Sequence, residues 1–311
     1  MERRSASGSQ HLSSKVFLPQ SMKSEKFTSF FQGEALLRLH QAIDLALAED
    51  GPDLTSQAVF PPGHVLHARI IAKQDTLVAG LLIAPIVMER CGQGSWAWSP
   101  HVQEGDFVPD RTEVASISAD AARLLKAERI ILNFLTHLSG IANLTREYVL
   151  TLEGTGTRLL DTRKTLPGLR YPEKYAVLVG GGHNHRKNLA EMLMLKDNHI
   201  DLAGGIAPAV ERLRASYAPC PPIEVECRTM DEVRQAIACG VDRIMLDNMT
   251  LDAMREALAI IPAAIETEVS GGVTLQSMRA IASVSEYGPD FISVGRLTHS
   301  APMADFSMLV E

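Results

Sequence analysis

From Thr157 onward, short apolar segments of the chain alternate with segments of helical periodicity. Six of the apolar segments have the length and composition of buried strands: RLLD, EMLMLK, IEVEC, RIMLD, IETEVS and FISVG. Helical segments lie between most of them; Thr229 and Glu232 form a capping-box pattern at the start of one, and Gly240 follows its end. Successive strand and helix units are typical of a parallel sheet, so this alternation predicts an α/β fold.

Two architectures share this local alternation, a parallel barrel and an open doubly wound sheet. The GxGxxG fingerprint of dinucleotide-binding doubly wound sheets is absent, and we therefore favour the barrel. Glu226, Asp247, Ser270 and Gly295 recur at intervals of 21, 23 and 25 residues, each at or just beyond the end of a predicted strand. Because barrel enzymes carry their chemistry at the carboxyl ends of the strands, these four positions predict a site.

The N-terminal part of the chain is predicted to hold an extension and a first domain. Residues 1–28 are Ser-rich and basic and lack apolar periodicity, which indicates a disordered or artificial extension rather than a targeting peptide. A helix that Gly51 and Pro52 end opens the first domain, which we place at 29–130. Strand-like segments follow, so we expect an open sheet with a flanking helix; they lie at 65–72, 76–83 and 110–119.

The transition between domains is expected in a long helical pattern over 120–151, with a kink or break at Ser139 and Gly140. The barrel domain then covers 131–295, and the tail 296–311 is predicted to return to the first domain.

Composition excludes several classes of function. The 311 residues carry a net charge of -7, which gives no overall basic field for nucleic acid, so we expect no nucleic-acid partner. No apolar run reaches the roughly 18 residues of a membrane span, and we expect no membrane partner either. The four cysteines show no CxxC pair and no regular framework, which favours reduced thiols in the cytoplasm.

The densest cationic stretch of the chain runs from Asp161 to His199, with seven Arg and Lys against four Asp and Glu. Arg binds a carboxylate or phosphate through two parallel hydrogen bonds and Lys supplies a point charge, so the stretch is interpreted as an anion-binding segment. A solvated basic loop is the alternative. The seven cations are Arg163, Lys164, Arg170, Lys174, Arg186, Lys187 and Lys196. His183 and His185 lack a third metal ligand, and we expect His185 to donate to a carboxylate instead.

The acidic residues at the strand ends leave several functions open. Glu226 and Asp247 could hold Mg²⁺ or ribose hydroxyls, stabilise a cationic sugar carbon, act as a general acid and base, or only neutralise Arg163 or Lys196. The glycine turns after the last two strands either bind phosphate through backbone amides or are ordinary turns. Arg129 lies in the long helical pattern, where a charged residue is usually at the surface.

Several motifs in the same order resemble the quinolinate phosphoribosyltransferase family: ERIILNFLTHLSGIA, DTRKTLPGLR, EKYAV, GGGHNHR, KDNHI, IEVEC, IMLDNM, SGG and ISVGRLTHS. The resemblance extends from about Phe30 to the C-terminus. It implies a type II phosphoribosyltransferase fold, with an N-terminal open α/β sandwich and a C-terminal incomplete α/β barrel. It also implies a homodimer, or a higher homo-oligomer, whose active sites are shared between subunits.

The resemblance also implies roles for individual residues. The cations that bind quinolinate fall on Arg163, Lys164, His185, Arg186 and Lys196, beside Thr162, with Arg129 reaching in from the neighbouring subunit. The acidic pair falls on Glu226 and Asp247, near the ribose and the Mg²⁺ cofactor, and the phosphate-binding turns on Ser270-Gly271-Gly272 and Ser293-Val294-Gly295.

The reaction implied is attack of the quinolinate nitrogen on phosphoribosyl pyrophosphate, followed by loss of CO₂, in NAD biosynthesis. Glu226 and Asp247 are expected to stabilise the cationic sugar carbon, and either Lys164 or Lys196 the carbanion left by CO₂. Two alternatives are a related transferase with another acceptor and a non-catalytic protein that binds a phosphosugar or a dicarboxylate.

Overall fold

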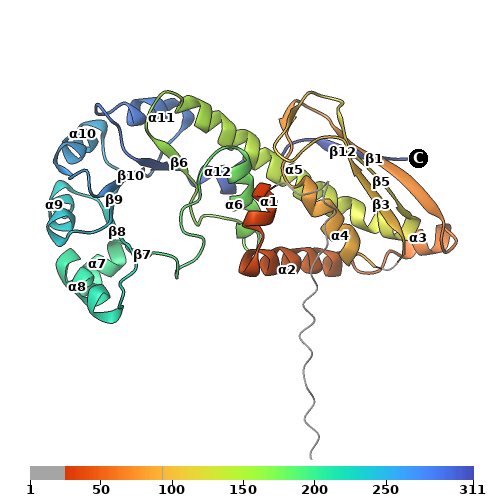
Figure 1. Cartoon of the computed structure of the whole chain (residues 1–311), viewed down its shortest axis with the longest axis horizontal. Coiled ribbons are helices and arrows are strands. Elements are labelled where there is room, and N and C mark those ends of the chain that lie inside the picture. The colour runs from red at the N-terminus through yellow and green to blue at the C-terminus, as the bar shows by residue number, and fades with distance from the viewer. Residues whose placement is uncertain (1–24, 93) are drawn as a thin grey trace, which may run out of the picture.

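The computed structural model describes residues 25–92 and 94–311. Figure 1 shows an antiparallel sheet with its helices on one side, a curved array of parallel strands and outer helices on the other, and the long helix α5 (Ala121–Thr151) running between them. The predicted α/β fold, with an N-terminal sandwich and an incomplete C-terminal barrel, is confirmed. No helix in these two ranges is long and apolar enough to cross a membrane.

The N-terminal sheet has four antiparallel strands in the order β12, β1, β5, β3. Their bounds are β1 Val65–Ala72, β3 Trp96–Pro100, β5 Glu113–Asp120 and β12 Phe306–Val310. Alternate residues of β1 from Ala68 onward are buried, because one face of the sheet packs against helices. The C-terminal strand β12 pairs with β1, so the last residues of the chain complete the first sheet.

Part of the strand prediction for this region is wrong. In 76–83 only β2 (Thr76–Leu77) is extended, pairing with β4 (Phe107–Val108), while Leu81–Ile83 forms a 3₁₀ turn that leads into α4 (Ala84–Arg90). Gly80 has a left-handed φ of 89°, and Pro85 stands in the first turn of α4, where it favours a helix start. The segment is buried on all sides, so its apolar run did not distinguish a strand from a buried helix.

The first three helices are α1 Glu25–Phe30, α2 Gly33–Asp50 and α3 Leu54–Val59. Of these, α1 and α2 lie at the junction between the two parts, and α3 packs on α5 at the far end of the N-terminal part (Figure 1). The predicted extension 1–28 ends too late, because residues 25–28 belong to α1, where Phe27 is 2% exposed and meets the ring of Tyr175 edge-on at 5.4 Å. The rest of that extension lies outside the described residues.

Helix α5 is one continuous element of 31 residues and does not break at Ser139 and Gly140. The Asp120 side chain caps it by accepting hydrogen bonds from the backbone N–H groups of Ala122 and Arg123. A Cβ on Gly140 would lie 2.0 Å from the carbonyl oxygen of Pro302, so the glycine allows the C-terminal tail to cross the helix closely. The domain boundary predicted at 130 falls inside this helix.

The second sheet has six parallel strands in the order β6, β11, β10, β9, β8, β7. Their bounds are β6 Arg158–Leu160, β7 Leu193–Leu195, β8 Ile223–Cys227, β9 Arg243–Asp247, β10 Glu266–Ser270 and β11 Phe291–Ser293. The first strand pairs with the last and the others follow in sequence order, which is the order of a barrel and not of a doubly wound sheet. β6 and β7 do not pair, so the barrel is incomplete at that point.

The helices of this part alternate with the strands along the chain. Their bounds are α6 Arg170–Val179, α7 Asp197–Ala203, α8 Ile206–Ser216, α9 Met230–Cys239, α10 Leu251–Ile260, α11 Leu275–Ala282 and α12 Arg296–His299. Thr229 caps α9 as predicted, and Gly240 ends it with φ 59°. The carboxylate of Glu232, however, accepts from the N–H of Arg228, so the capping box is only half formed.

The close crossing at Gly140 yields a stability prediction. We expect Gly140→Ala to lower the free energy of unfolding by about 2 kcal/mol or more, because the added methyl group meets backbone atoms that cannot move aside. Denaturant unfolding measures this change. Gly156→Ala is the control, since its Cβ would meet only one atom, at 3.8 Å, and equal stability of the two variants would contradict the close packing.

Candidate active site

A cavity of about 440 Å³ lies at the carboxyl ends of the barrel strands. Ten of the residues predicted from the sequence line it: Thr162, Arg163, Lys164, His185, Arg186, Lys196, Glu226, Asp247, Ser270 and Ser293. They come from separate strands and loops between residues 162 and 293, and the parallel sheet brings these strand ends together. Gly271, Gly272, Val294 and Gly295 directly follow Ser270 and Ser293 in the chain.

The strand register sets which side chains reach the cavity. Asp247 of β9 stands beside Ser270 of β10, and Met245 stands beside both Glu226 and Glu268. Side chains alternate between the two faces of a strand, so residues two positions before the strand ends point the same way one layer deeper. Glu268 and Met245 therefore also line the cavity, as does Met194 of β7. Only residues at the strand ends were predicted, although the alternation of apolar and acidic residues in IEVEC and ETEVS also indicates this deeper layer.

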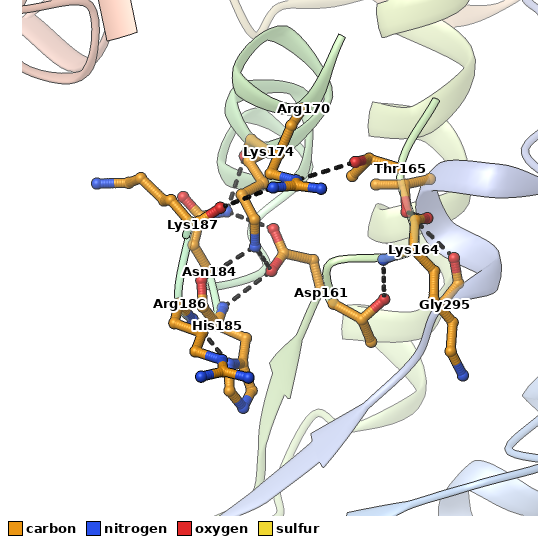
Figure 2. A network of polar contacts seen from close by, with 12 residues as sticks. Asp161, Lys164, Thr165, Arg170, Lys174, Asn184, His185, Arg186, Lys187 and Gly295 are labelled. Carbon is orange, nitrogen blue, oxygen red and sulfur yellow. Dashed lines mark hydrogen bonds and ion pairs between the residues drawn. The ribbon is translucent and has the colours of Figure 1, made fainter. Parts of the chain in front are cut away.

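The loop after β6 presents the first cations of the cavity. The backbone N–H of Lys164 donates to Thr162 Oγ1 at 3.0 Å, and its carbonyl accepts from Thr298 Oγ1 at 2.8 Å. A Cβ on Gly295 would lie 2.9 Å from Lys164 Cδ, so the glycine leaves room for the lysine side chain. The ammonium group of Lys164 has no hydrogen-bond or ion-pair partner in the described part of the chain and extends away from the network in Figure 2.

Arg186 and Lys196 lie on the other side of the gap between β6 and β7, and protein groups bind both of them. Arg186 donates from Nη1 to the carbonyl of Met192 at 2.9 Å, and Lys196 Nζ donates to Glu226 Oε2 at 2.6 Å. Burial, and then the positive charge of Arg163, lower the pKa of Arg186. The smaller, electrostatic part of this shift reflects repulsion between the two guanidinium groups, and an anion bound near both would relieve it.

Not all seven cations of the Asp161 to His199 stretch serve the cavity. Lys174 is fully buried and donates to Asp161, which is also fully buried. Arg170 donates to Thr165 Oγ1 at 3.2 Å, and Lys187 pairs with Glu191 at 3.8 Å. Figure 2 shows Lys174 pointing inward to Asp161 and Lys187 pointing away. The interpretation of the whole stretch as an anion-binding segment is therefore too broad, and four of its cations line the cavity: Arg163, Lys164, Arg186 and Lys196.

His185 lines the cavity but directs both ring nitrogens at protein atoms. Nδ1 accepts a hydrogen bond from the N–H of Arg186 at 2.7 Å, which assigns the ring proton to Nε2. Nε2 lies 3.1 Å from Glu224 Oε2 and 3.6 Å from Glu268 Oε2. In this tautomer Nε2 has no lone pair for a metal, and its N–H faces the two carboxylates without forming a hydrogen bond. That His185 donates to a ligand carboxylate stays a prediction.

Glu224 and Glu268 form an acidic floor under the cavity. Both carboxylates are fully buried, and their ligand atoms and that of His185 all lie within 4.8 Å of one another. Burial, and then the nearby Glu224, raise the pKa of Glu268 to about 7. Arg243 Nη1 approaches Glu268 at 3.3 Å from below and offsets part of this charge.

Two residues differ from the sequence prediction: Asn248 was not predicted but lines the cavity, and Arg129 was predicted but lies outside it. Asn248, which the sequence analysis did not select, lines the cavity with a left-handed φ of 53°, and its side chain fills the space where a Cβ of Gly271 would lie. Arg129 does not reach this cavity. It is exposed on α5 and borders a separate cavity of about 480 Å³ with Asn133 and His137.

The acidic floor yields a prediction on pH. A carboxyl group whose pKa is higher in the folded state binds more protons when folded, so its contribution to stability falls as the pH rises from its ordinary value of 4.5 through about 7. We expect the free energy of unfolding to decrease between pH 5 and pH 8, and Glu268→Gln to remove about 1 kcal/mol or more of that decrease. Chemical denaturation across this pH range measures it. The control is Glu256→Gln, because Glu256 is exposed. If the free energy of unfolding of Glu268→Gln decreased with pH as steeply as that of the wild type, the raised pKa of Glu268 would be wrong.

Comparison with known proteins extends over both parts of the chain. Residues 141–309 match the family model "Quinolinate phosphoribosyl transferase, C-terminal domain", and residues 53–139 match that of the N-terminal domain. The chain is 41% identical over 256 residues to a probable nicotinate-nucleotide pyrophosphorylase (carboxylating) of Bacillus subtilis, covering 82% of this chain and 87% of that protein. It is 38% identical to the chloroplastic nicotinate-nucleotide pyrophosphorylase (carboxylating) of Arabidopsis thaliana, covering 88% and 83%.

Solved structures agree with this result. NadC from Streptococcus pyogenes matches with a TM-score of 0.81 at 36% identity, covering 88% of this chain and 97% of that chain. The nicotinate-nucleotide pyrophosphorylase from Francisella tularensis matches with a TM-score of 0.81 at 33% identity, covering 95% and 100%. With both family models matched and relatives above 30% identity over most of its length, the chain belongs to the quinolinate phosphoribosyl transferase family.

Proposed function

We propose that this protein transfers the phosphoribosyl group of phosphoribosyl pyrophosphate to quinolinate and releases pyrophosphate and CO₂, which yields nicotinate mononucleotide for NAD biosynthesis. The observation that carries the proposal is one cavity with cations on one side, and with strand-end carboxylates and the serines that precede the glycine turns on the other. A pyridine dicarboxylate fits the first side, and a phosphorylated sugar fits the second. The names of the relatives, nicotinate-nucleotide pyrophosphorylase (carboxylating), support the same reaction.

The cationic side is assigned to quinolinate. Arg163 and Arg186 can each bind a carboxylate through two parallel hydrogen bonds, while Lys164 and Lys196 add positive charge. Holding both carboxylates fixes the ring, so that its nitrogen faces the sugar side of the cavity. Attack on the sugar carbon then occurs between two bound groups, which removes most of the entropy cost of bringing them together.

The acidic side is assigned to the ribose and to Mg²⁺. One oxygen of Glu226 accepts from Lys196 and one oxygen of Asp247 accepts from Asn248, which leaves the second oxygen of each without a hydrogen bond in the described residues. Carboxylate oxygens at the mouth of a cavity suit Mg²⁺, which keeps several waters and binds through few protein groups. When bound, Mg²⁺ would neutralise charge on the departing pyrophosphate. The carboxylates themselves would stabilise positive charge that develops on the sugar carbon.

Of the two lysines, we assign Lys164 to the decarboxylation step. Lys196 is hydrogen-bonded to Glu226, whereas the ammonium group of Lys164 has no partner within the described ranges. After the ring nitrogen is attached to the sugar, the bond from ring C2 to its carboxylate breaks and the electron pair stays on C2. A nearby ammonium group would stabilise that pair electrostatically and can supply the proton that replaces CO₂.

We further propose a homodimer in which Arg129 completes the neighbouring subunit's cavity. Arg129 is exposed on α5 and lies outside its own cavity, next to loop residues Leu166–Leu169 that follow Lys164. A twofold axis would place the same surface of each subunit against the other, so one contact would supply both cavities.

The proposed location is the cytoplasm. All four cysteines lie in the described part of the chain and none forms a disulfide, and Cys227 is buried. Unpaired thiols fit a reducing compartment.

Loss of one guanidinium group tests the assignment of the cationic side. We expect Arg163→Ala to lower quinolinate-dependent release of pyrophosphate about 100-fold or more, because a buried charge-assisted contact is lost. A coupled pyrophosphate assay measures it, with the exposed Arg234→Ala as the control. Unchanged turnover would contradict the assignment. Release of CO₂ from quinolinate separates this function from a transferase with another acceptor, and binding without pyrophosphate release would indicate a non-catalytic protein.

Mixing two inactive variants tests the shared site. Arg129→Ala and Lys164→Ala should each be inactive alone. In a randomly exchanged equal mixture, roughly a quarter of the sites should be intact, because each heterodimer combines both lesions in one site and leaves the other unaltered. Recovery of about that fraction of activity is the expected result. An inactive mixture, with subunit exchange verified, would exclude a contribution of Arg129 across the interface.

A further inference from the structure

Asp161 joins three segments that surround the cavity. It follows β6 directly, and its carboxylate accepts hydrogen bonds from Lys174 Nζ of α6, from the backbone N–H of His185 at 2.9 Å and from Asn184 Nδ2 at 2.7 Å. Figure 2 shows these bonds converging on Asp161 between the Lys164 loop and the His185 segment. Both oxygens of the carboxylate are therefore occupied by protein groups.

Lys174 strengthens the same connection. Its ammonium group donates to Asp161 and also to the carbonyl oxygen of His185 at 3.0 Å. The N–H and the C=O of His185 are thus both bound by this buried pair. Burial raises the pKa of Asp161 and lowers that of Lys174, so burial alone opposes charge on both groups. Removing one partner of a buried ion pair is strongly destabilising, whereas replacing both by apolar side chains of similar volume is often neutral or stabilising.

The groups that this pair joins lie next to the two cavity arginines in the chain. Asp161 lies two residues before Arg163, and its partner His185 lies one residue before Arg186. The positive charge of Arg163 acts on Arg186, so the two guanidinium groups repel one another when no anion is bound.

β6 and β7 do not pair, but the His183 segment forms one parallel bridge with β6. In this bridge the N–H of His183 donates to the carbonyl of Leu159 at 2.9 Å, and the N–H of Asp161 donates to the carbonyl of His183 at 3.0 Å. Beyond this bridge, the side-chain bonds of Asp161 and Lys174 hold His185 beside the end of β6.

We infer that Asp161 and Lys174 are positioning residues, which hold Arg163 and Arg186 at the separation that two adjacent carboxylates on one pyridine ring require. This inference rests on the proposed assignment of the two arginines to quinolinate. Neither Asp161 nor Lys174 reaches the cavity itself, because both are fully buried. Their effect on the ligand is transmitted through the backbone that carries the arginines.

The test compares ligands that carry one or two carboxylates. The double variant Asp161→Asn/Lys174→Met removes both charges together, so no unpaired charge is left in the interior. Binding of quinolinate, nicotinate and picolinate to the wild type and to the variant is measured by calorimetry in the absence of phosphoribosyl pyrophosphate. We expect the dissociation constant of quinolinate to rise about tenfold or more, and those of the two monocarboxylates to change less than about threefold. Each monocarboxylate needs only one of the arginines.

A matched control separates positioning from a general loss of stability. Arg123 is a buried cation on α5 that binds the carbonyl oxygens of Met88 and Gly94, far from the cavity. Arg123→Met should destabilise the fold without altering the preference for the dicarboxylate. The single variant Lys174→Met leaves Asp161 buried and unpaired. If this single variant fails to fold, ligand binding to the double variant decides the question.

Two results would overturn the inference. One is an unchanged affinity for quinolinate in a folded double variant, and the other is an equal loss for all three ligands. If Arg163→Ala itself left quinolinate binding intact, the proposed assignment of the cationic side would fail first. A large effect of Arg163→Ala with no effect of the double variant would retain that assignment and reject only the positioning role.

Discussion

The site depends on the register of the parallel strands in the barrel. Asp247 stands beside Ser270, and Met245 stands between Glu226 and Glu268, so the side chains that face the cavity lie in two layers. Any shift of one strand by one residue would turn its cavity-facing side chains to the other face. The cations cannot be placed in this way, because they lie in loops after β6 and near β7, where the barrel is not closed. A backbone bridge between Leu160 and His183 and the buried side-chain bonds of Asp161 and Lys174 hold the His185 segment instead.

The sequence predicted the barrel better than the N-terminal domain, for a physical reason. All six barrel strands were found, because strands buried on both faces appear as short apolar runs between turns. The same rule failed at 76–83, where a 3₁₀ turn and a buried helix give an equally apolar run. The break expected at Ser139 and Gly140 also failed. There the glycine permits a close contact with Pro302, which is distant in sequence and cannot be seen from local periodicity.

The sequence predicted the candidate residues at the strand ends well. It did not predict which charged residues are buried and paired inside the protein. Glu226, Asp247 and Ser270 line the cavity as predicted. Counting charges placed Lys174 with the ligand-binding cations, yet it is fully buried against Asp161, and a count of charges contains no information on which partner a side chain will meet. Glu224 and Glu268 were missed because an acidic residue in a strand is expected at the surface unless it is paired. Their pairing with His185 and Arg243 exists only in the folded chain.

The charges of the cavity also restrict how a dianion can enter it. Glu224 and Glu268 lie at the floor, and part of their charge is offset by Arg243 from below and by the Nε2–H of His185 from above. A carboxylate is therefore repelled from the floor and attracted to the side that holds Arg163 and Arg186. Under the proposed assignment, both carboxylates of quinolinate, which are on adjacent ring atoms, would turn to this cationic side, and the ring nitrogen next to one of them would face the sugar side. The acidic floor would thus orient the substrate by repulsion, as the arginines do by attraction.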